Sequence, residues 1–219
     1  MTERTLHRIF ITGGTGYLGG RLVPALLGRG QAVSLLIRPG SESKRFPGAA
    51  TLVGNPLDEK SYRDRIAPAD TFIHLVGVPK PAPWKGAQFR AIDLVSIRAA
   101  VNAAVDARIG HFIYVSVARP ASVMKEYIAV RAEGERLIRA AGLSATIIRP
   151  WYILGPGHRW PMALLPVYRL LGQFPSTRET AERLGLVTLD QMIGALVSAV
   201  EHPPEGIRII PVPEIRQFR

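Results

Sequence analysis

Three glycines at positions 13, 16 and 19 have the spacing of a loop that binds phosphate. The segment Thr12-Gly13-Gly14-Thr15-Gly16-Tyr17-Leu18-Gly19 follows a short apolar run and precedes a helical pattern. Glycine has no Cβ, so the backbone can turn sharply here and approach a pyrophosphate. The helix that follows would present free N–H groups and the positive end of its dipole to the anion. This context predicts a dinucleotide site with contacts from Gly13, Thr15, Gly16, Tyr17, Leu18 and Gly19.

The residue after the second apolar run indicates which dinucleotide binds. An NAD site usually places an acidic residue about 20 residues beyond the glycine loop, where it holds the ribose hydroxyls. Here that place holds Arg38, with Ser41 and Lys44 close behind, and Glu42 is the acid nearby. A guanidinium suits a 2′-phosphate and stacks on adenine. We therefore expect NADP(H) to be favoured, with NAD(H) as the alternative cofactor.

Other residues that could do chemistry give weaker signals. His74 ends an apolar run, and we expect its imidazole to be packed beside the glycine loop and satisfied by backbone groups. The loops that hold Trp84 and His158-Arg159-Trp160 could bind an anionic or aromatic substrate or could simply be packed. The five histidines are scattered and show no metal-ligand spacing, so we expect no metal site.

Apolar runs rich in Val and Ile alternate with helical patterns, which predicts parallel βαβ units. The fold class is therefore α/β, a doubly wound parallel sheet of Rossmann type with helices on both faces and its ligand crevice at the carboxyl ends of the strands. We expect residues 1–219 to form one domain, in which approximately 151–188 make substrate-side loops and a helix. The expected strands are 8–12, 32–37, 51–53, 71–76, 111–115 and 145–149. The expected helices are 18–29, 88–107, 127–141 (ending at Gly142) and 189–201 (capped by Asp190), and the segments 79–83 and 151–160 are expected to be loops.

Composition excludes several classes of protein. The 219 residues include no cysteine, so disulfides and thiol catalysis are excluded. No apolar run reaches the length of a membrane span, and the first residues do not resemble a signal peptide, so we expect a cytoplasmic protein. The net charge is +11, but the arginines are dispersed along the chain, and no nucleic-acid partner is expected. Association with an anionic membrane is the weakest of the functional alternatives, and a protein partner cannot be inferred from the sequence.

Over nearly its whole length the chain resembles the short-chain dehydrogenase/reductase superfamily, in its extended and atypical branches. Thr12–Gly19 is similar to the glycine motif of these families. Residues 54–58, Gly-Asn-Pro-Leu-Asp, resemble the motif that meets adenine, with Asn55 where Asp is usual. Residues 72–77 resemble the end of their fourth strand, and Arg149-Pro150 resembles the loop after the sixth. The resemblance adds Asn55, Pro56, Leu57, Val76, Gly77 and Pro150 to the expected cofactor site. With 219 residues, the chain resembles the atypical group more than the larger nucleotide-sugar epimerases.

The resemblance also implies a catalytic group. The family uses a Tyr and a Lys four residues later, which one helical turn brings to the same face. Here the pair is Tyr127 and Arg131, so the charge is kept but the second residue cannot shuttle a proton. The family's Ser or Thr lies just past the fifth strand. Ser116 is one position early and Val117 occupies the expected place, while Ser122 is a weaker substitute.

Two interpretations follow from this pattern. The first is an NADP(H)-dependent oxidoreductase or an epimerase/dehydratase-type enzyme acting on a small carbonyl or alcohol substrate. In it, Tyr127 exchanges the proton of the substrate oxygen, Arg131 orients the ribose, and Ser116 is the hydroxyl partner. The second is a non-catalytic NADP(H)-binding protein, a redox sensor or scaffold in which the Tyr-Lys site has degraded.

Overall fold

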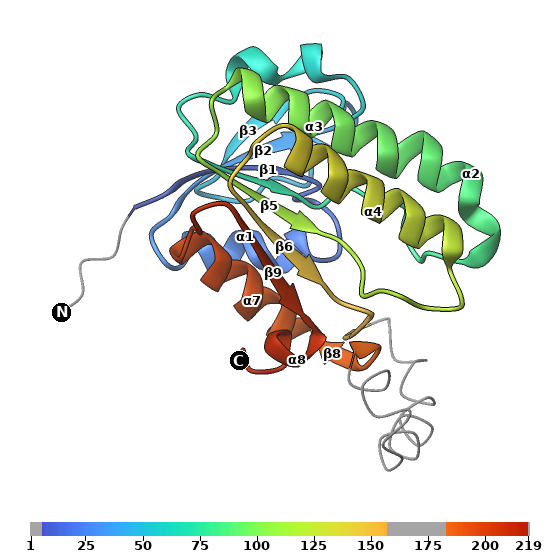
Figure 1. Cartoon of the computed structure of the whole chain (residues 1–219). Helices are drawn as coiled ribbons and strands as arrows, with labels where there is room; N and C mark the ends of the chain where they lie inside the picture. Colours follow the sequence, from blue (N-terminus) through green and yellow to red (C-terminus); the bar gives the residue numbers. More distant parts are fainter. Residues whose placement is uncertain (1–5, 157–182, 219) are drawn as a thin grey trace.

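Seven parallel strands form the centre of the molecule (Figure 1). The computed structural model describes residues 6–156 and 183–218. The strands lie in the order β3-β2-β1-β4-β5-β6-β9, and each pairs in parallel with its neighbours. Their bounds are β1 Arg8–Thr12, β2 Ala32–Ile37, β3 Ala50–Val53, β4 Thr71–His74, β5 His111–Val115, β6 Ala145–Arg149 and β9 Ile207–Pro211.

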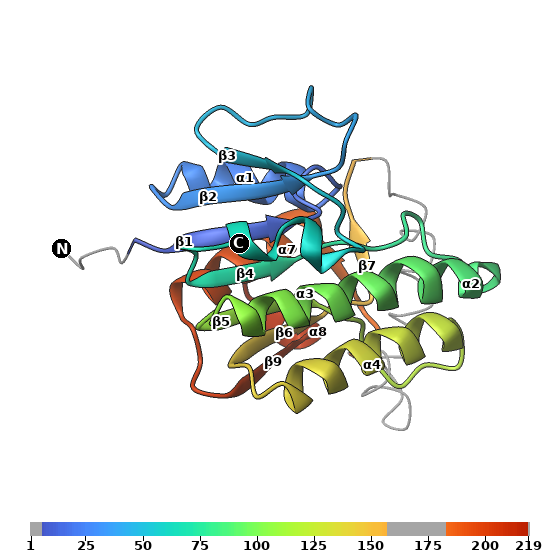
Figure 2. The ribbon, with the colours of Figure 1, turned by 90° about the horizontal axis from the view of Figure 1, so that it is seen from above.

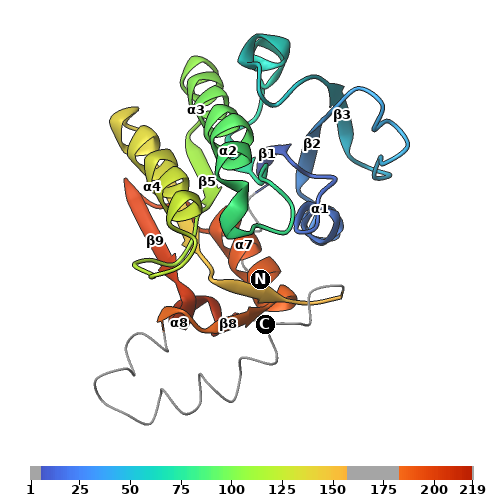
Figure 3. The same ribbon diagram turned by 90° about the vertical axis from the view of Figure 1, so that its right-hand side faces the viewer.

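Helices cover both faces of the sheet, so the fold has three layers (Figures 1 and 3). One face carries α3 and α4, which run side by side, and the other carries α1, α7 and the short α8 (Figures 1 and 2). The helices are α1 Gly19–Leu27, α2 Gly86–Gln88, α3 Val95–Asp106, α4 Lys125–Ala140, α7 Leu189–Glu201 and α8 Val212–Ile215, with the short 3-10 turns η1 Glu59–Ser61, η2 Arg63–Arg65 and η3 Pro83–Lys85. A π-helical segment, η4 Phe89–Leu94, joins α2 to α3.

Alternating side chains give each face of the sheet its own core. On β1, Ile9 and Ile11 face the α1 and α7 side, whereas Phe10 faces α3 and α4. Phe10 pairs in register with Phe72 on β4, which pairs with Phe112 on β5. Neighbouring rings in this row have centroids 5.2 Å apart. These aromatic contacts hold β1, β4 and β5 together beneath the strand ends where the crevice forms.

The predicted α/β class is confirmed. Four predicted strands and helix 189–201 have the predicted bounds, and the other predicted elements differ at their ends. Gly142, with φ +67°, follows the end of α4, as predicted for a residue that ends a helix. The predicted Asp190 cap is wrong, because Thr188 caps this helix. Its side chain accepts from the Gln191 N–H, and the Gln191 Oε1 accepts from the Thr188 N–H. The predicted loop 151–160 contains strand β7, Tyr152–Leu154, which pairs with β8, Leu186–Thr188, in a separate two-stranded sheet. Residues 157–182 of the predicted substrate-side segment 151–188 lie outside the described residues.

The strand order reverses between β1 and β4. The chain runs outward from β1 through β2 to β3 and then returns to β4 on the other side of β1. In open α/β sheets, ligands bind beyond the carboxyl ends of the strands at this reversal. The loops after β1 and β4 are therefore the ones expected to hold the cofactor.

Candidate active site

A cavity of about 510 Å³ opens at the carboxyl ends of the strands. Its walls come from the loops that follow β1, β4, β5 and β6 and from helix α4. Ten of the residues predicted from sequence line it together: Gly13, Gly16, Tyr17, Leu18, Gly19, Gly77, Ser116, Tyr127, Arg131 and Pro150. The structure thus brings the glycine loop and the Tyr-Arg pair to one cavity.

The glycine loop packs closely on the loop after β4 because Gly13 has no side chain. Gly13 has φ +78°, and a Cβ there would lie 2.7 Å from the carbonyl carbon of Leu75. The loops after β1 and β4 therefore pack against each other without any side chain between them. The Gly16 N–H donates to the Gly13 carbonyl at 3.0 Å, which closes the turn before α1 begins at Gly19. This backbone fits a pyrophosphate placed at the helix N-terminus.

Tyr127 and Arg131 lie one turn apart on α4. Tyr127 is half-buried and packs against Phe89, with ring centroids 5.0 Å apart. The Arg131 guanidinium carbon lies 5.1 Å from the centre of the Tyr127 ring. It also lies 5.7 Å from the centre of the Tyr114 ring, which belongs to β5. The positive charge is therefore placed beside the phenol, as the family's lysine would be.

A buried aspartate that the sequence analysis missed holds Arg131 in place. Arg131 Nη2 donates to Asp93 Oδ1 at 2.7 Å, and Arg131 Nη1 donates to the Val115 carbonyl at 3.1 Å. Asp93 Oδ2 in turn accepts from the Val78 N–H at 2.9 Å. A Cβ at Gly77 would overlap Arg131 Nη2, so this glycine makes room for the guanidinium. The sequence does offer one signal of this role. Asp93 lies between the apolar Ile92 and Leu94 in a helical pattern, and a buried acid needs a charged partner.

The electrostatics of this pair favour a permanent ion pair. Burial raises the pKa of Asp93 above its usual range, while Arg131 and the Val78 N–H oppose that rise. Burial also acts to lower the pKa of Arg131, but Tyr127, Tyr114 and Asp93 outweigh it, and the pKa of Arg131 is raised overall. Arg131 therefore stays charged and acts as a fixed cation, not as a proton carrier.

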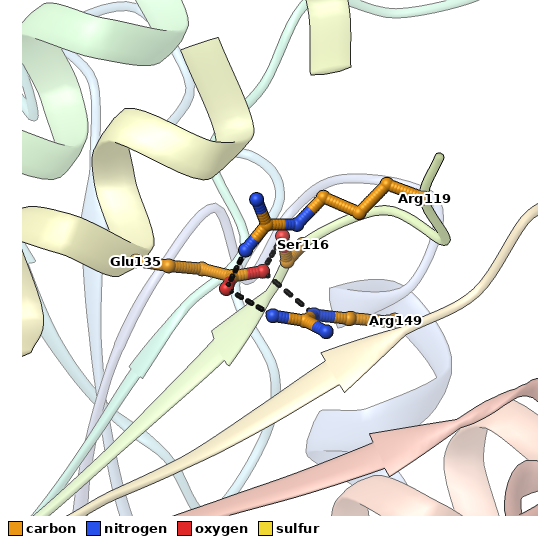
Figure 4. Close-up of polar contacts among 4 residues, drawn as sticks. All are labelled: Ser116, Arg119, Glu135 and Arg149. Atoms are coloured by element: carbon orange, nitrogen blue, oxygen red, sulfur yellow. Dashed lines mark hydrogen bonds and ion pairs between the residues drawn. The ribbon is translucent and has the colours of Figure 1, made fainter. Parts of the chain in front are cut away.

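The Ser116 hydroxyl is bound by a second buried acid, Glu135 of α4 (Figure 4). Ser116 Oγ donates to Glu135 Oε1 at 2.6 Å. Arg119 donates to Glu135 Oε2 at 2.7 Å, and Arg149 makes two bonds to the same carboxylate at 2.9 and 2.5 Å. Burial acts to raise the pKa of Glu135, but the bonds from Arg149 and Ser116 outweigh it and lower that pKa. Because the proton of Ser116 points to a charged carboxylate, it is not free to be donated to a substrate oxygen.

His74 lies beneath the cavity and is fully buried. Its Nδ1 lies 2.8 Å from Thr12 Oγ1 and its Nε2 lies 3.3 Å from Ser96 Oγ, so hydroxyl side chains satisfy it and not the predicted backbone groups. Ser96 donates to the Asp93 carbonyl, so it accepts from His74 Nε2–H, and Nδ1 then accepts from Thr12. Burial, with a smaller effect of Arg131, lowers the pKa of His74 to about 3. His74 is therefore a neutral structural residue.

Several predicted cofactor residues lie outside the cavity walls: Thr15, Arg38, Asn55, Pro56, Leu57 and Val76. Arg38 is exposed directly after β2. Asn55 Oδ1 accepts from the Leu57 N–H at 3.0 Å and so shapes its own loop. His158, Arg159 and Trp160 lie outside the described residues. Within the described ranges, no three His, Asp or Glu side chains gather as metal ligands, and no helix is long and apolar enough to cross a membrane.

Comparison with protein families matches residues 13–158 to a model described as NAD(P)H-binding. The matched segment includes the glycine loop, Asp93, Tyr127 and Arg131. The chain belongs to the NAD(P)H-binding family. Together with the seven-stranded parallel sheet, this match identifies an NAD(P)H-binding protein of Rossmann type.

Proteins similar in sequence to this chain include named enzymes. A ceramide reductase of Caulobacter vibrioides is 30% identical over 202 residues, which are 91% of this chain and 62% of the relative. A Stigmatella aurantiaca ketoreductase of a farnesyl-dihydroquinoline oxide is 28% identical, over 68% of this chain and 51% of the relative. The chain thus spans less than two thirds of the length of these relatives.

Solved structures show the same fold. The Bordetella bronchiseptica enzyme WbmH, in complex with NAD+, superposes with a TM-score of 0.69 at 19% identity, over 94% of this chain and 75% of that chain. UDP-N-acetylglucosamine 4-epimerase from Bacillus cereus superposes with a TM-score of 0.66 at 16% identity, over 94% of this chain and 76% of that chain. At these identities the likeness concerns the fold alone.

Proposed function

We propose that this chain is an NAD(P)H-dependent reductase of an apolar carbonyl compound. The observation that carries the proposal is that Tyr127, its fixed cation Arg131 and the glycine loop line one cavity with largely apolar walls. Apart from the glycine loop, Gly77, the tyrosines and the polar Lys80, Ser116 and Arg131, the walls are formed by Leu75, Val78, Pro79, Pro81, Val115, Val117, Met124, Pro150, Trp151 and Ile153. The names of the relatives, a ceramide reductase and a farnesyl-dihydroquinoline ketoreductase, support a bulky apolar substrate.

The residues present can carry out the proton half of such a reduction. A bound nicotinamide supplies the hydride that reaches the carbonyl carbon. Tyr127 donates the proton that converts the carbonyl oxygen to a hydroxyl, and the nearby Arg131 stabilises the phenolate that remains. Because Arg131 stays charged, Tyr127 must recover its proton from solvent, which its half-buried position allows. A protein that only binds the cofactor is not favoured, because the relatives are named reductases.

Substrate chain length tests the apolar cavity. We expect kcat/KM for reduction of straight-chain ketones by NADPH to rise about fourfold for each buried methylene, which corresponds to about 0.8 kcal/mol. The rate is followed as the loss of reduced-cofactor absorbance. A flat dependence on chain length, or a preference for charged ketones, would contradict an apolar substrate while leaving the cofactor site intact.

We further infer that NADPH is preferred over NADH and that the protein works in the cytoplasm. Arg38 supports the first inference, because it is exposed at the end of β2 beside the strand that leads into the glycine loop. We expect Arg38→Asp to weaken NADPH binding about 10- to 100-fold while NADH binding changes little, as for the loss of a charge-assisted contact. Arg139→Asp, on the exposed end of α4, is the matched control with the same charge change. Equal affinity of the wild type for NADPH and NADH would exclude the role of Arg38.

A further inference from the structure

Two loops at the cavity mouth gather positive charge that is dispersed in the sequence. Segment 79–90 runs from the loop after β4 into the first residues of η4, and segment 118–127 runs from the loop after β5 into the first turn of α4. Together they contain five basic residues and one acidic residue. The acid, Glu126, forms an ion pair with Arg90 across the two segments. Pro79, Lys80, Pro81 and Met124 line the cavity. The first three are exposed and Met124 is partly exposed, so both loops border the cavity opening.

The same two loops expose large apolar side chains. Trp84 is 83% exposed and Val123 is 52% exposed, whereas large hydrophobic residues elsewhere are mostly buried in the two cores. The loops also touch each other, because Phe89 packs on Tyr127 and Gly86 lies against Glu126. The start of α4 and the segment labelled α2 lie side by side in Figures 1 and 2. We call Lys80, Trp84, Lys85, Val123 and Lys125 the mouth patch.

An exposed tryptophan among lysines has the chemistry of a membrane interface. Trp places its apolar ring at the level of lipid headgroups while its N–H stays hydrated. Lysines near an anionic leaflet are attracted to it, and the attraction decays within about 8 Å at physiological salt. Lys85 Nζ donates to the Pro79 and Lys80 carbonyls at 2.8 and 3.0 Å, which holds the loop in this shape. The mouth patch therefore offers charge and an apolar anchor together.

We propose that the mouth patch docks the protein on an anionic bilayer surface, with the cavity opening toward the lipid. This proposal rests on the proposed function in one respect: an apolar carbonyl substrate partitions into lipid, and docking would place the cavity where that substrate is concentrated. Docking itself requires no cofactor and no turnover. It involves the patch residues and the headgroups, not a membrane-spanning helix.

The test is co-sedimentation of the full chain with vesicles, in the absence of cofactor and ketone. We expect binding to phosphatidylcholine vesicles that contain roughly one third phosphatidylglycerol, weakening as salt rises, and no binding to pure phosphatidylcholine. The double variant K80E/K125E should weaken binding at least about 10-fold, because two attractive charges become repulsive. Trp84→Ala should also weaken binding while leaving the NADPH affinity unchanged.

The matched control is R108E/R139E, which changes the net charge equally at two exposed residues away from the cavity. This control should bind anionic vesicles as the wild type does. Equal losses in the two double variants would show attraction by net charge alone and would overturn the patch. Binding to soluble polyglutamate without binding to vesicles would indicate an acidic protein partner and would also overturn the proposal. NADPH affinity and thermal stability, measured on each variant, separate a failure of docking from a failure of the fold or of the cofactor site.

Discussion

At the level of single residues, a substitution of Ser116 tests whether its hydroxyl acts on the substrate, as the family's serine does. The Ser116 hydroxyl donates a hydrogen bond to Glu135, and the same carboxylate forms ion pairs with Arg119 and Arg149 (Figure 4). We expect Ser116→Ala to lower kcat less than about 10-fold and to lower the free energy of unfolding by about 1–3 kcal/mol, because a buried acceptor loses a donor. Steady-state kinetics and urea unfolding measure the two effects. The exposed Ser122→Ala should change neither, and a loss of kcat in Ser116→Ala as large as that of Tyr127→Phe would show that Ser116 acts on the substrate.

The buried ion pair with Asp93 compensates the charge of Arg131, which stands where the family has a lysine. Its side chains are 0% and 8% exposed, whereas those of the Glu126–Arg90 pair are 53% and 58% exposed. We expect Asp93→Asn to lower the free energy of unfolding by about 3–5 kcal/mol, because it leaves a buried guanidinium uncompensated. Glu126→Gln is the matched control and should cost less than about 1 kcal/mol. Similar costs measured by urea unfolding would show that the buried pair does not hold Arg131.

At the scale of elements, the junction between the loops after β1 and β4 depends on Gly13. We expect Gly13→Ala to abolish NADPH binding and to destabilise the fold, because the residue has φ +78° and the added Cβ would meet the Leu75 backbone. Gly20→Ala, in the first turn of α1, meets no atom within 4 Å and should be neutral or stabilising by about 0.5–1 kcal/mol. Titration with NADPH and thermal unfolding compare the two. If Gly13→Ala still binds NADPH, the glycine loop is not the pyrophosphate site.

Elements could be predicted wherever local pattern and burial agree. The strands that flank the switch point carry period-2 or fully apolar runs, and their ends are within two residues of the prediction. Strand β9 was missed although Ile207, Ile209 and Ile210 are typical of a strand, because the segment follows two prolines and no later element marks it as part of the sheet. The role of Asp93 was not predictable, because its partners Arg131 and Val78 lie on other segments and meet it only in the folded chain.

At the scale of the whole molecule, two buried histidines make stability depend on pH. Burial lowers the pKa of His74 to about 3 and, with a smaller effect of His7, lowers the pKa of His111 to about 4. The unfolded chain binds these protons below about pH 6.5, so the stability they contribute is present above that pH and is lost as the pH falls. We expect each histidine to lower the free energy of unfolding by about 1.5 kcal/mol between pH 6.5 and pH 5. Urea unfolding at several pH values measures how the free energy of unfolding changes with pH. His111→Asn should reduce this slope by the equivalent of about one proton taken up on unfolding. An unchanged slope would show that His111 is protonated in the folded state.

Tyr127 is proposed to complete a reduction in the cavity that also binds the cofactor. The most direct measurement is a single turnover with NADPH deuterated at the transferring C4 position and an apolar ketone, with the alcohol analysed by mass spectrometry. We expect deuterium in the alcohol from the wild type and a rate lower by about 100- to 10,000-fold in Tyr127→Phe, at unchanged NADPH affinity. An unchanged rate in Tyr127→Phe, or no deuterium transfer to any apolar ketone although NADPH binds, would contradict this proposal.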